Sequence, residues 1–197
     1  MTARQWPLGL GLALGLAALA SGLFSGDDTI EQWRLAARWT ARVGFPLFIV
    51  AYSASAVGRL WRNDVTRAVW RDRRWWGLGF AAAHTVHLGA LVTFLQVSGE
   101  TRPPLVWFVA GTGYALMFVM VATSNDAAMR ALGTNWRRLH ALGIHWLWFV
   151  FLASYAGRIM QPGTMSIGLS GTITALAALT LRIAVRFQGR TRRPAAA

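Results

Sequence analysis

The sequence has no cysteine and no lysine, and it holds only 7 acidic residues among 197. Without thiols the chain cannot form disulfides, hold iron–sulfur clusters through thiolates or attach c-type heme covalently. Any iron that it binds must be held by histidine, methionine or oxygen ligands.

The sequence is rich in apolar residues, and these fall in long runs. Hydrophobic residues make up 55 % of the chain and charged residues 14 %, which is too little charge to cover a soluble domain of this size. The formal net charge of +13 could indicate a nucleic-acid binder. However, the arginines lie in short loops between the apolar runs, where they act as topology signals. We therefore predict an integral membrane protein that contacts lipid and binds no nucleic acid.

Six apolar runs are long enough to cross a bilayer as helices. They cover residues 8–24, 42–57, 75–97, 105–122, 139–156 and 167–185. The fold class predicted from these runs is all-α, an integral membrane bundle of about six transmembrane helices. We expect one domain over residues 1–187 and a disordered, basic cytoplasmic tail over residues 188–197.

The arginines are divided unequally between the two sides of this bundle. The amino terminus, the second and fourth loops and the tail carry fifteen, and the opposite side carries five. Because basic residues accumulate on the cytoplasmic side, both termini are predicted to be cytoplasmic. The first 21 residues also resemble a cleavable signal peptide, with a basic start and Ala18-Leu19-Ala20 as the cleavage site. In the same run, Gly11 and Gly15 form a small-residue motif that favours helix packing.

All four histidines, His84, His87, His140 and His145, lie in the third and fifth runs. An ionisable side chain inside a membrane is costly and is therefore a candidate functional group. At 1.5 Å per residue from the cytoplasmic helix starts, His84 and His87 lie about 13 and 18 Å deep, His145 about 10–13 Å and His140 about 3–5 Å. His84 or His87 can therefore sit level with His145.

Two histidines at one depth on facing helices can ligate a heme iron from both sides. The predicted spans contain no Asp or Glu, which disfavours a catalytic zinc site and a carboxylate proton relay. Two alternatives stay open: a heme-free transporter or scaffold whose histidines form structural hydrogen bonds, and a membrane metalloenzyme with a histidine-bound metal.

Three blocks of sequence carry a family resemblance. They are Arg73-Arg74-x-x-Gly77-Leu78 with His87 later in the run; Thr123-Ser124, Leu132-Gly133 and Trp136-Arg137-Arg138-Leu139-His140; and, more weakly, Asp27-Asp28 with Trp39-Thr40-Ala41-Arg42. These blocks resemble the ferric reductase-like transmembrane family, and within it the heme-binding membrane subunits of the periplasmic methionine sulfoxide reductase. The resemblance extends over residues 25–155.

The resemblance implies a six-helix bundle that holds heme b, one or two per chain, and moves electrons across the membrane. By position, His87 and His140 match family ligands in the third and fifth spans. The family has a further histidine thirteen residues after His140, where this sequence has Ala153. Since depth places His145 level with the third-span pair, we predict His87 and His145 as the iron ligands. His84 and His140 are predicted to belong to the same cofactor site.

These expectations define an oxidoreductase electron-transfer subunit with no assigned catalytic residue and no flavin or nicotinamide domain of its own. We expect its electrons to come from a separate cytoplasmic flavoprotein or from membrane quinol. The expected acceptor is a periplasmic protein or small molecule, and the expected location is a bacterial inner (plasma) membrane.

Overall fold

The computed structural model describes residues 4–191, with side chains up to residue 188, and it confirms the all-α prediction. Its helices are α1 (Trp6–Ser25), α2 (Thr29–Leu60), α3 (Asp64–Arg71), α4 (Arg73–Ser98), α5 (Pro104–Ala122), α6 (Asp126–Leu132), α7 (Thr134–Ile159) and α8 (Met165–Thr191). Six of them, all except α3 and α6, are long and apolar enough to cross a membrane. Each predicted span lies inside one of these six helices, so the chain is a multi-pass membrane protein.

α2 is longer than its apolar run. It begins at Thr29, where the side chain of Asp28 accepts a hydrogen bond from the backbone N–H of Glu31 at 2.9 Å. Its 32 residues span about 48 Å at 1.5 Å per residue, whereas the hydrocarbon core of a bilayer is about 30 Å thick. Hydropathy detects only the apolar part of such a helix, which is why the predicted span starts thirteen residues too late.

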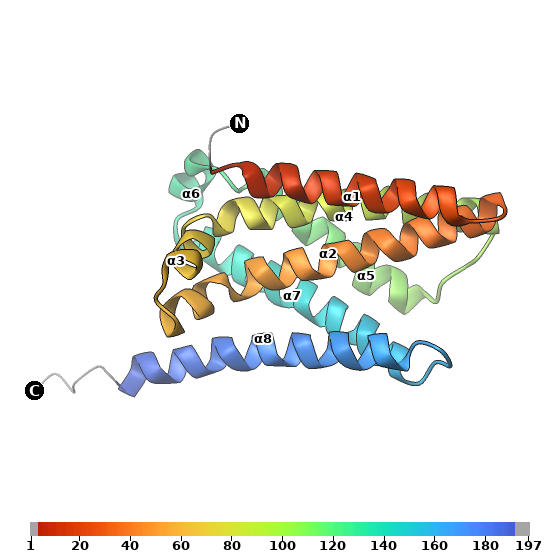
Figure 1. Ribbon diagram of the computed structural model, residues 1–197. Helices are drawn as coiled ribbons and strands as arrows, with labels where there is room; N and C mark the ends of the chain where they lie inside the picture. The colour runs from red at the N-terminus through yellow and green to blue at the C-terminus, as the bar shows by residue number, and fades with distance from the viewer. Residues whose placement is uncertain (1–3, 192–197) are drawn as a thin grey trace, which may run out of the picture.

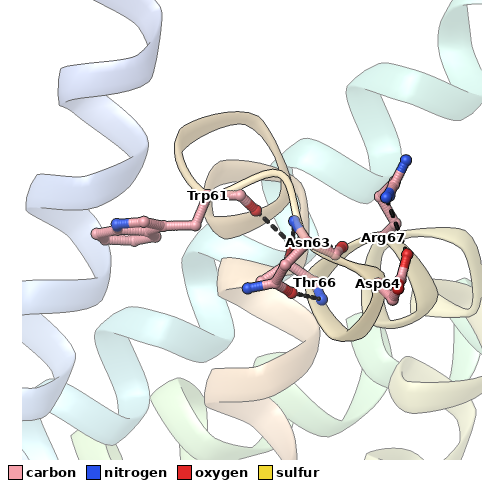
Figure 2. A network of polar contacts seen from close by, with 5 residues as sticks. All are labelled: Trp61, Asn63, Asp64, Thr66 and Arg67. Carbon is pink, nitrogen blue, oxygen red and sulfur yellow. Dashed lines mark hydrogen bonds and ion pairs between the residues drawn. The ribbon is translucent and has the colours of Figure 1, made fainter.

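The two short helices begin with side-chain caps in the loops between spans. Figure 2 shows the start of α3, where Asn63 and Thr66 form a reciprocal capping box and Arg67 pairs with Asp64 at 2.9 Å. The Thr66 hydroxyl also donates to the carbonyl of Trp61. Such caps satisfy backbone groups that a helix leaves unpaired at its ends. A hydropathy reading does not detect these loop helices.

Helix ends gather at two opposite ends of the bundle. α1 begins and α8 ends at one of them, where α3 and α6 also lie (Figure 1); we call it the terminal end. This agrees with both termini lying on one side of a membrane, and their cytoplasmic location stays a prediction. α8 continues to Thr191, so residues 188–191 of the predicted tail are helical. Residues 192–197 lie outside the described part of the chain.

α1 packs so closely on α4 and α2 that backbone meets backbone. A β-carbon at Gly11 would collide with the carbonyl of Gly79, and one at Gly15 would lie 3.0 Å from the Cα of Ala83. Farther along α1, Gly22 meets Ala36 of α2 in the same way. The small-residue packing predicted for this run is therefore confirmed.

The main core lies where α2, α4, α7 and α8 meet. Its largest members are Phe45, Phe48 and Tyr52 from α2, Phe80 from α4 and Phe151 from α7. The Phe48 ring lies 5.3 Å from Phe80 and 5.0 Å from Phe151, between centroids. Small residues of α8, among them Ala175, complete this core. It places aromatic rings around His84 of α4.

Candidate functional site

His84 and His87 lie one turn apart on α4 and form the deepest part of the site. Their ring centroids are 4.9 Å apart. His84 is 9 % exposed and stacks between the rings of Phe80 and Tyr114, at 5.1 and 5.3 Å. Gly44 of α2 makes this position possible, because a β-carbon there would lie 2.8 Å from Nδ1 of His84.

The ring of His87 is oriented by α2. Its Nδ1 lies 3.1 Å from Oγ1 of Thr40. The Thr40 hydroxyl hydrogen is directed to the carbonyl of Ala36 at 2.7 Å, so the Thr40 oxygen acts as an acceptor toward His87. Nδ1 of His87 therefore carries the hydrogen, and Nε2 keeps its lone pair. Iron-bound histidines have this arrangement, in which an outer partner holds Nδ1–H and fixes the tautomer.

His145 of α7 has a similar partner at another level of α2. Its Nδ1 lies 3.1 Å from the hydroxyl of Tyr52, a side chain that is 0 % exposed. The carbonyl of Tyr52 accepts a hydrogen bond from Arg182 of α8 at 2.6 Å, and the Arg182 guanidinium lies 4.4 Å from the Tyr52 ring centroid. His145, Tyr52 and Arg182 thus link α7, α2 and α8, and Nε2 of His145 points away from this contact.

His140 is held through the opposite ring nitrogen. Its Nε2 lies 3.1 Å from Oγ1 of Thr123, whose hydrogen is directed to the Val119 carbonyl at 2.8 Å. His140 therefore donates from Nε2, and Nδ1 keeps the lone pair. The ring also stacks on Trp136 at 4.0 Å, and Trp136 donates to the Thr123 carbonyl at 2.8 Å. The second sequence block thus folds into one unit that joins α5 to α7.

The structure brings His84 and His87 together and gives the other two histidines separate surroundings. Thr40 and Tyr52 are twelve residues apart on α2, which is about 18 Å along the helix axis and about 120° around it. His87 and His145 bond to α2 at these two levels, so binding one iron between them requires one ring to leave its hydroxyl partner. Their joint ligation stays a prediction.

Two buried polar atoms near His84 lack partners. Among the described residues, neither Nδ1 of His84 nor the hydroxyl of Tyr114 has a hydrogen-bond partner. Buried polar atoms are almost always paired in folded proteins, so such exceptions point to a bound group or water. Together with the free Nε2 of His87, they give this region donor atoms that fit a heme iron and polar groups beside it.

A metal-ion centre finds less support. Within residues 4–191, no group of three or more His, Cys, Asp or Glu side chains lies close enough to hold a metal ion. A protein zinc site ordinarily uses three or four such ligands. The two neighbouring histidines of α4 are fewer ligands than such a site ordinarily uses.

Sequence reasoning did not single out the hydroxyl partners as site residues. Thr40 and Thr123 belong to the blocks that carry the family resemblance, yet hydropathy and spacing give them no role. Tyr52 and Tyr114 lie in apolar runs and carry no local signal. Their contacts join residues up to 93 positions apart, and only the fold reveals them.

No protein-family model matches this chain, and no solved structure matches it.

Proposed function

We propose that this chain is a heme b membrane protein of the ferric reductase-like kind that passes electrons across a bilayer. The observation that carries the proposal is the ring of His87. It lies within a candidate membrane span, its Nδ1–H is held by Thr40, and its Nε2 keeps a lone pair. An imidazole in this state is the usual axial ligand of a protein-bound heme.

His87 and His145 are the residues that would hold heme iron, and bound heme would supply the one-electron chemistry. Thr40 and Tyr52 would keep both rings in one orientation where each histidine holds its own heme. Where the two histidines share one iron, one ring would leave its hydroxyl partner. His84 would line the site, with its unpaired Nδ1 beside Gly44 of α2. The aromatic residues of the core, Phe80 and Phe151 among them, would exclude water and keep the surroundings apolar.

The two levels of α2 are consistent with transfer across the membrane. His145 and Tyr52 lie nearer the terminal end, and His87 and Thr40 lie about 18 Å farther along α2. We propose that electrons enter at the terminal end from a cytoplasmic flavoprotein or from quinol. They would leave at the opposite end to a periplasmic protein or small molecule, and the membrane would be a bacterial inner (plasma) membrane.

The test is the absorbance of the full chain purified in mild detergent from heme-supplemented cells. A reduced-minus-oxidised spectrum of b type is expected, with at least one heme per chain by pyridine hemochrome. A colourless protein that also fails to take up added heme would refute the proposal. Reporter fusions at residue 197 and in the 99–103 loop test the direction, because they should report opposite sides of the membrane.

A second candidate is a heme-free transporter or scaffold, and one observation favours it. The Nε2 and the ring face of His140 are used in joining α5 to α7, through Thr123 and Trp136. If His84, His87 and His145 have the same purely structural purpose, no cofactor is needed. The spectrum separates the two candidates, since a scaffold remains colourless.

A further inference from the structure

We infer that the terminal ends of α2 and α8 form a binding site for a phosphate group. The site is a cavity of about 170 Å³ lined by Ser55, Ala56, Arg59, Arg182, Val185 and Arg186. Three of these six residues are arginines, and none is acidic. No histidine lines the cavity, although Arg182 also contacts Tyr52, the partner of His145.

The charge of the cavity is not neutralised by the protein. Among the described residues, no carboxylate pairs with Arg59, Arg182 or Arg186. Arg182 and Arg186 are four residues apart on α8, so they lie on the same face of the helix and their like charges repel each other. Like charges held together without counter-charges disfavour the folded arrangement unless an anion joins them.

Arg182 is already held in place. Its Nη1 donates to the carbonyl of Tyr52 at 2.6 Å, and its guanidinium lies on the Tyr52 ring, 4.4 Å from the centroid. A guanidinium has five donors in a planar fork, so these contacts leave other N–H groups for a ligand. Little side-chain entropy remains to be lost when an anion binds.

The size and chemistry of the cavity favour phosphate. Liquid water occupies about 30 Å³ per molecule, so the cavity has room for about five waters, or for a tetrahedral group with its contacts. The forked guanidinium matches phosphate oxygens in a bidentate way, and the Ser55 hydroxyl supplies one neutral donor.

The depth of the cavity in the membrane also favours a phosphate ligand. The cavity lies in the last two turns of α2 and beside residues 182–186 of α8, the last of which lies two positions before the end of the apolar span at Gln188. This is the level of lipid headgroups, and Trp61, next to α2, is 54 % exposed there. Basic pockets between helices at this level bind anionic headgroups. The phosphate can therefore belong to a phospholipid or be free.

The experiment measures binding to the full chain after delipidation in mild detergent. Its arms are inorganic phosphate, phosphatidylglycerol in mixed micelles, and the zwitterionic phosphatidylcholine as reference. The expected result is saturable binding of phosphatidylglycerol or of inorganic phosphate, seen as a rise in Tm and by native mass spectrometry. The probe that binds shows whether the phosphate group belongs to a phospholipid or is free.

Variants decide whether the cavity is the site. The double variant Arg59→Gln/Arg186→Gln is expected to weaken binding about tenfold or more, since it removes two charge-assisted contacts. Arg137→Gln/Arg138→Gln removes the same charge at the same end of the bundle and should leave binding unchanged. Ser55→Leu fills the cavity without changing charge and should also weaken binding. Equal loss in both double variants, or no saturable binding of either probe, would overturn the inference.

Discussion

His87 and His140 have the same partner chemistry, and they use it in opposite ways. Each ring lies 3.1 Å from a threonine oxygen whose own hydrogen is directed to a helix carbonyl. His87 meets that oxygen with Nδ1, and His140 meets it with Nε2. The first arrangement leaves Nε2 of His87 free to bind iron. In the second, Nε2 of His140 is occupied by the hydrogen bond to Thr123, which joins two helices.

Under the proposed function, the nitrogen that remains free would decide which intramembrane histidine binds heme, and depth and residue type would not. The reason is that heme iron would be bound through the unhindered Nε2. Hydrogen-bond partners contributed by another helix determine which nitrogen this is. The predictions below test that distinction, from the largest expected effect to the smallest.

The largest effect is expected for His87→Ala. Removal of an iron ligand should exceed the roughly 10- to 100-fold loss caused by removing a ligand's outer partner, so heme should be nearly absent from the purified variant. Pyridine hemochrome per chain is the measurement, with His140→Ala as the matched control. Full heme content with an unchanged spectrum in His87→Ala would remove this residue from the site and leave His84 as the candidate.

A large effect is also expected for His145→Ala. The Tyr52 hydroxyl contacts Nδ1 of His145. When Nδ1 donates to that hydroxyl, Nε2 keeps its lone pair for iron, and the variant should lose heme about tenfold or more. His140→Ala should keep its heme. The two variants are compared side by side, by heme content and by redox titration. If only His140→Ala loses heme, the family position is the better guide and the free-nitrogen rule fails.

A smaller effect is expected for the hydroxyl partners. Thr40→Val keeps the shape of the side chain and removes the acceptor for Nδ1–H, so heme affinity should fall about 10- to 100-fold. Thr123→Val should leave heme affinity unchanged and lower the free energy of unfolding by about 1 kcal/mol, the usual value of one hydrogen bond. Heme titration and denaturant unfolding measure the two quantities. Equal heme affinities in the two variants would contradict the distinction.

The smallest effect concerns pH and lies outside the membrane. The hydrogen bond from Arg71 holds the pKa of the Asp72 carboxyl below its ordinary value of 3.8, against the opposing effect of burial. A lowered folded-state pKa contributes stability that is present above pH 3.8 and is lost as the pH falls through the folded value. Thermal unfolding between pH 7 and 3 should show a small acid loss that Asp72→Asn reduces. An unchanged acid loss in that variant would show that other carboxylates cause it.

Much of the fold could be predicted because membrane helices are read from local composition. Each apolar run became one helix, and the glycines of α1 made the expected close contacts. The start of α2 could not be found this way, since its first turns are polar and are fixed by the Asp28 cap. The loop helices α3 and α6 depend on caps that hydropathy does not detect.

The candidate site was only partly predictable. Ionisable residues in apolar runs are visible in a sequence, so all four histidines were found. Their partners were not, because Thr40 meets His87 across 47 positions and Tyr52 meets His145 across 93. Depth counted from helix starts also ignores the tilt of α7, which crosses the bundle obliquely (Figure 1).

The backbone contact between α1 and α4 has a consequence for biosynthesis. Gly11 and Gly79 are 68 positions apart, so α1 enters the membrane long before its partner surface is made. The α1–α2 hairpin can close early through Gly22 and Ala36. The face of α1 that carries Gly11 remains exposed to lipid until α4 is inserted. We therefore expect a Gly11→Leu chain to insert normally and to fail only after α4 emerges. Protease protection of nascent chains truncated before and after α4 would reveal that order.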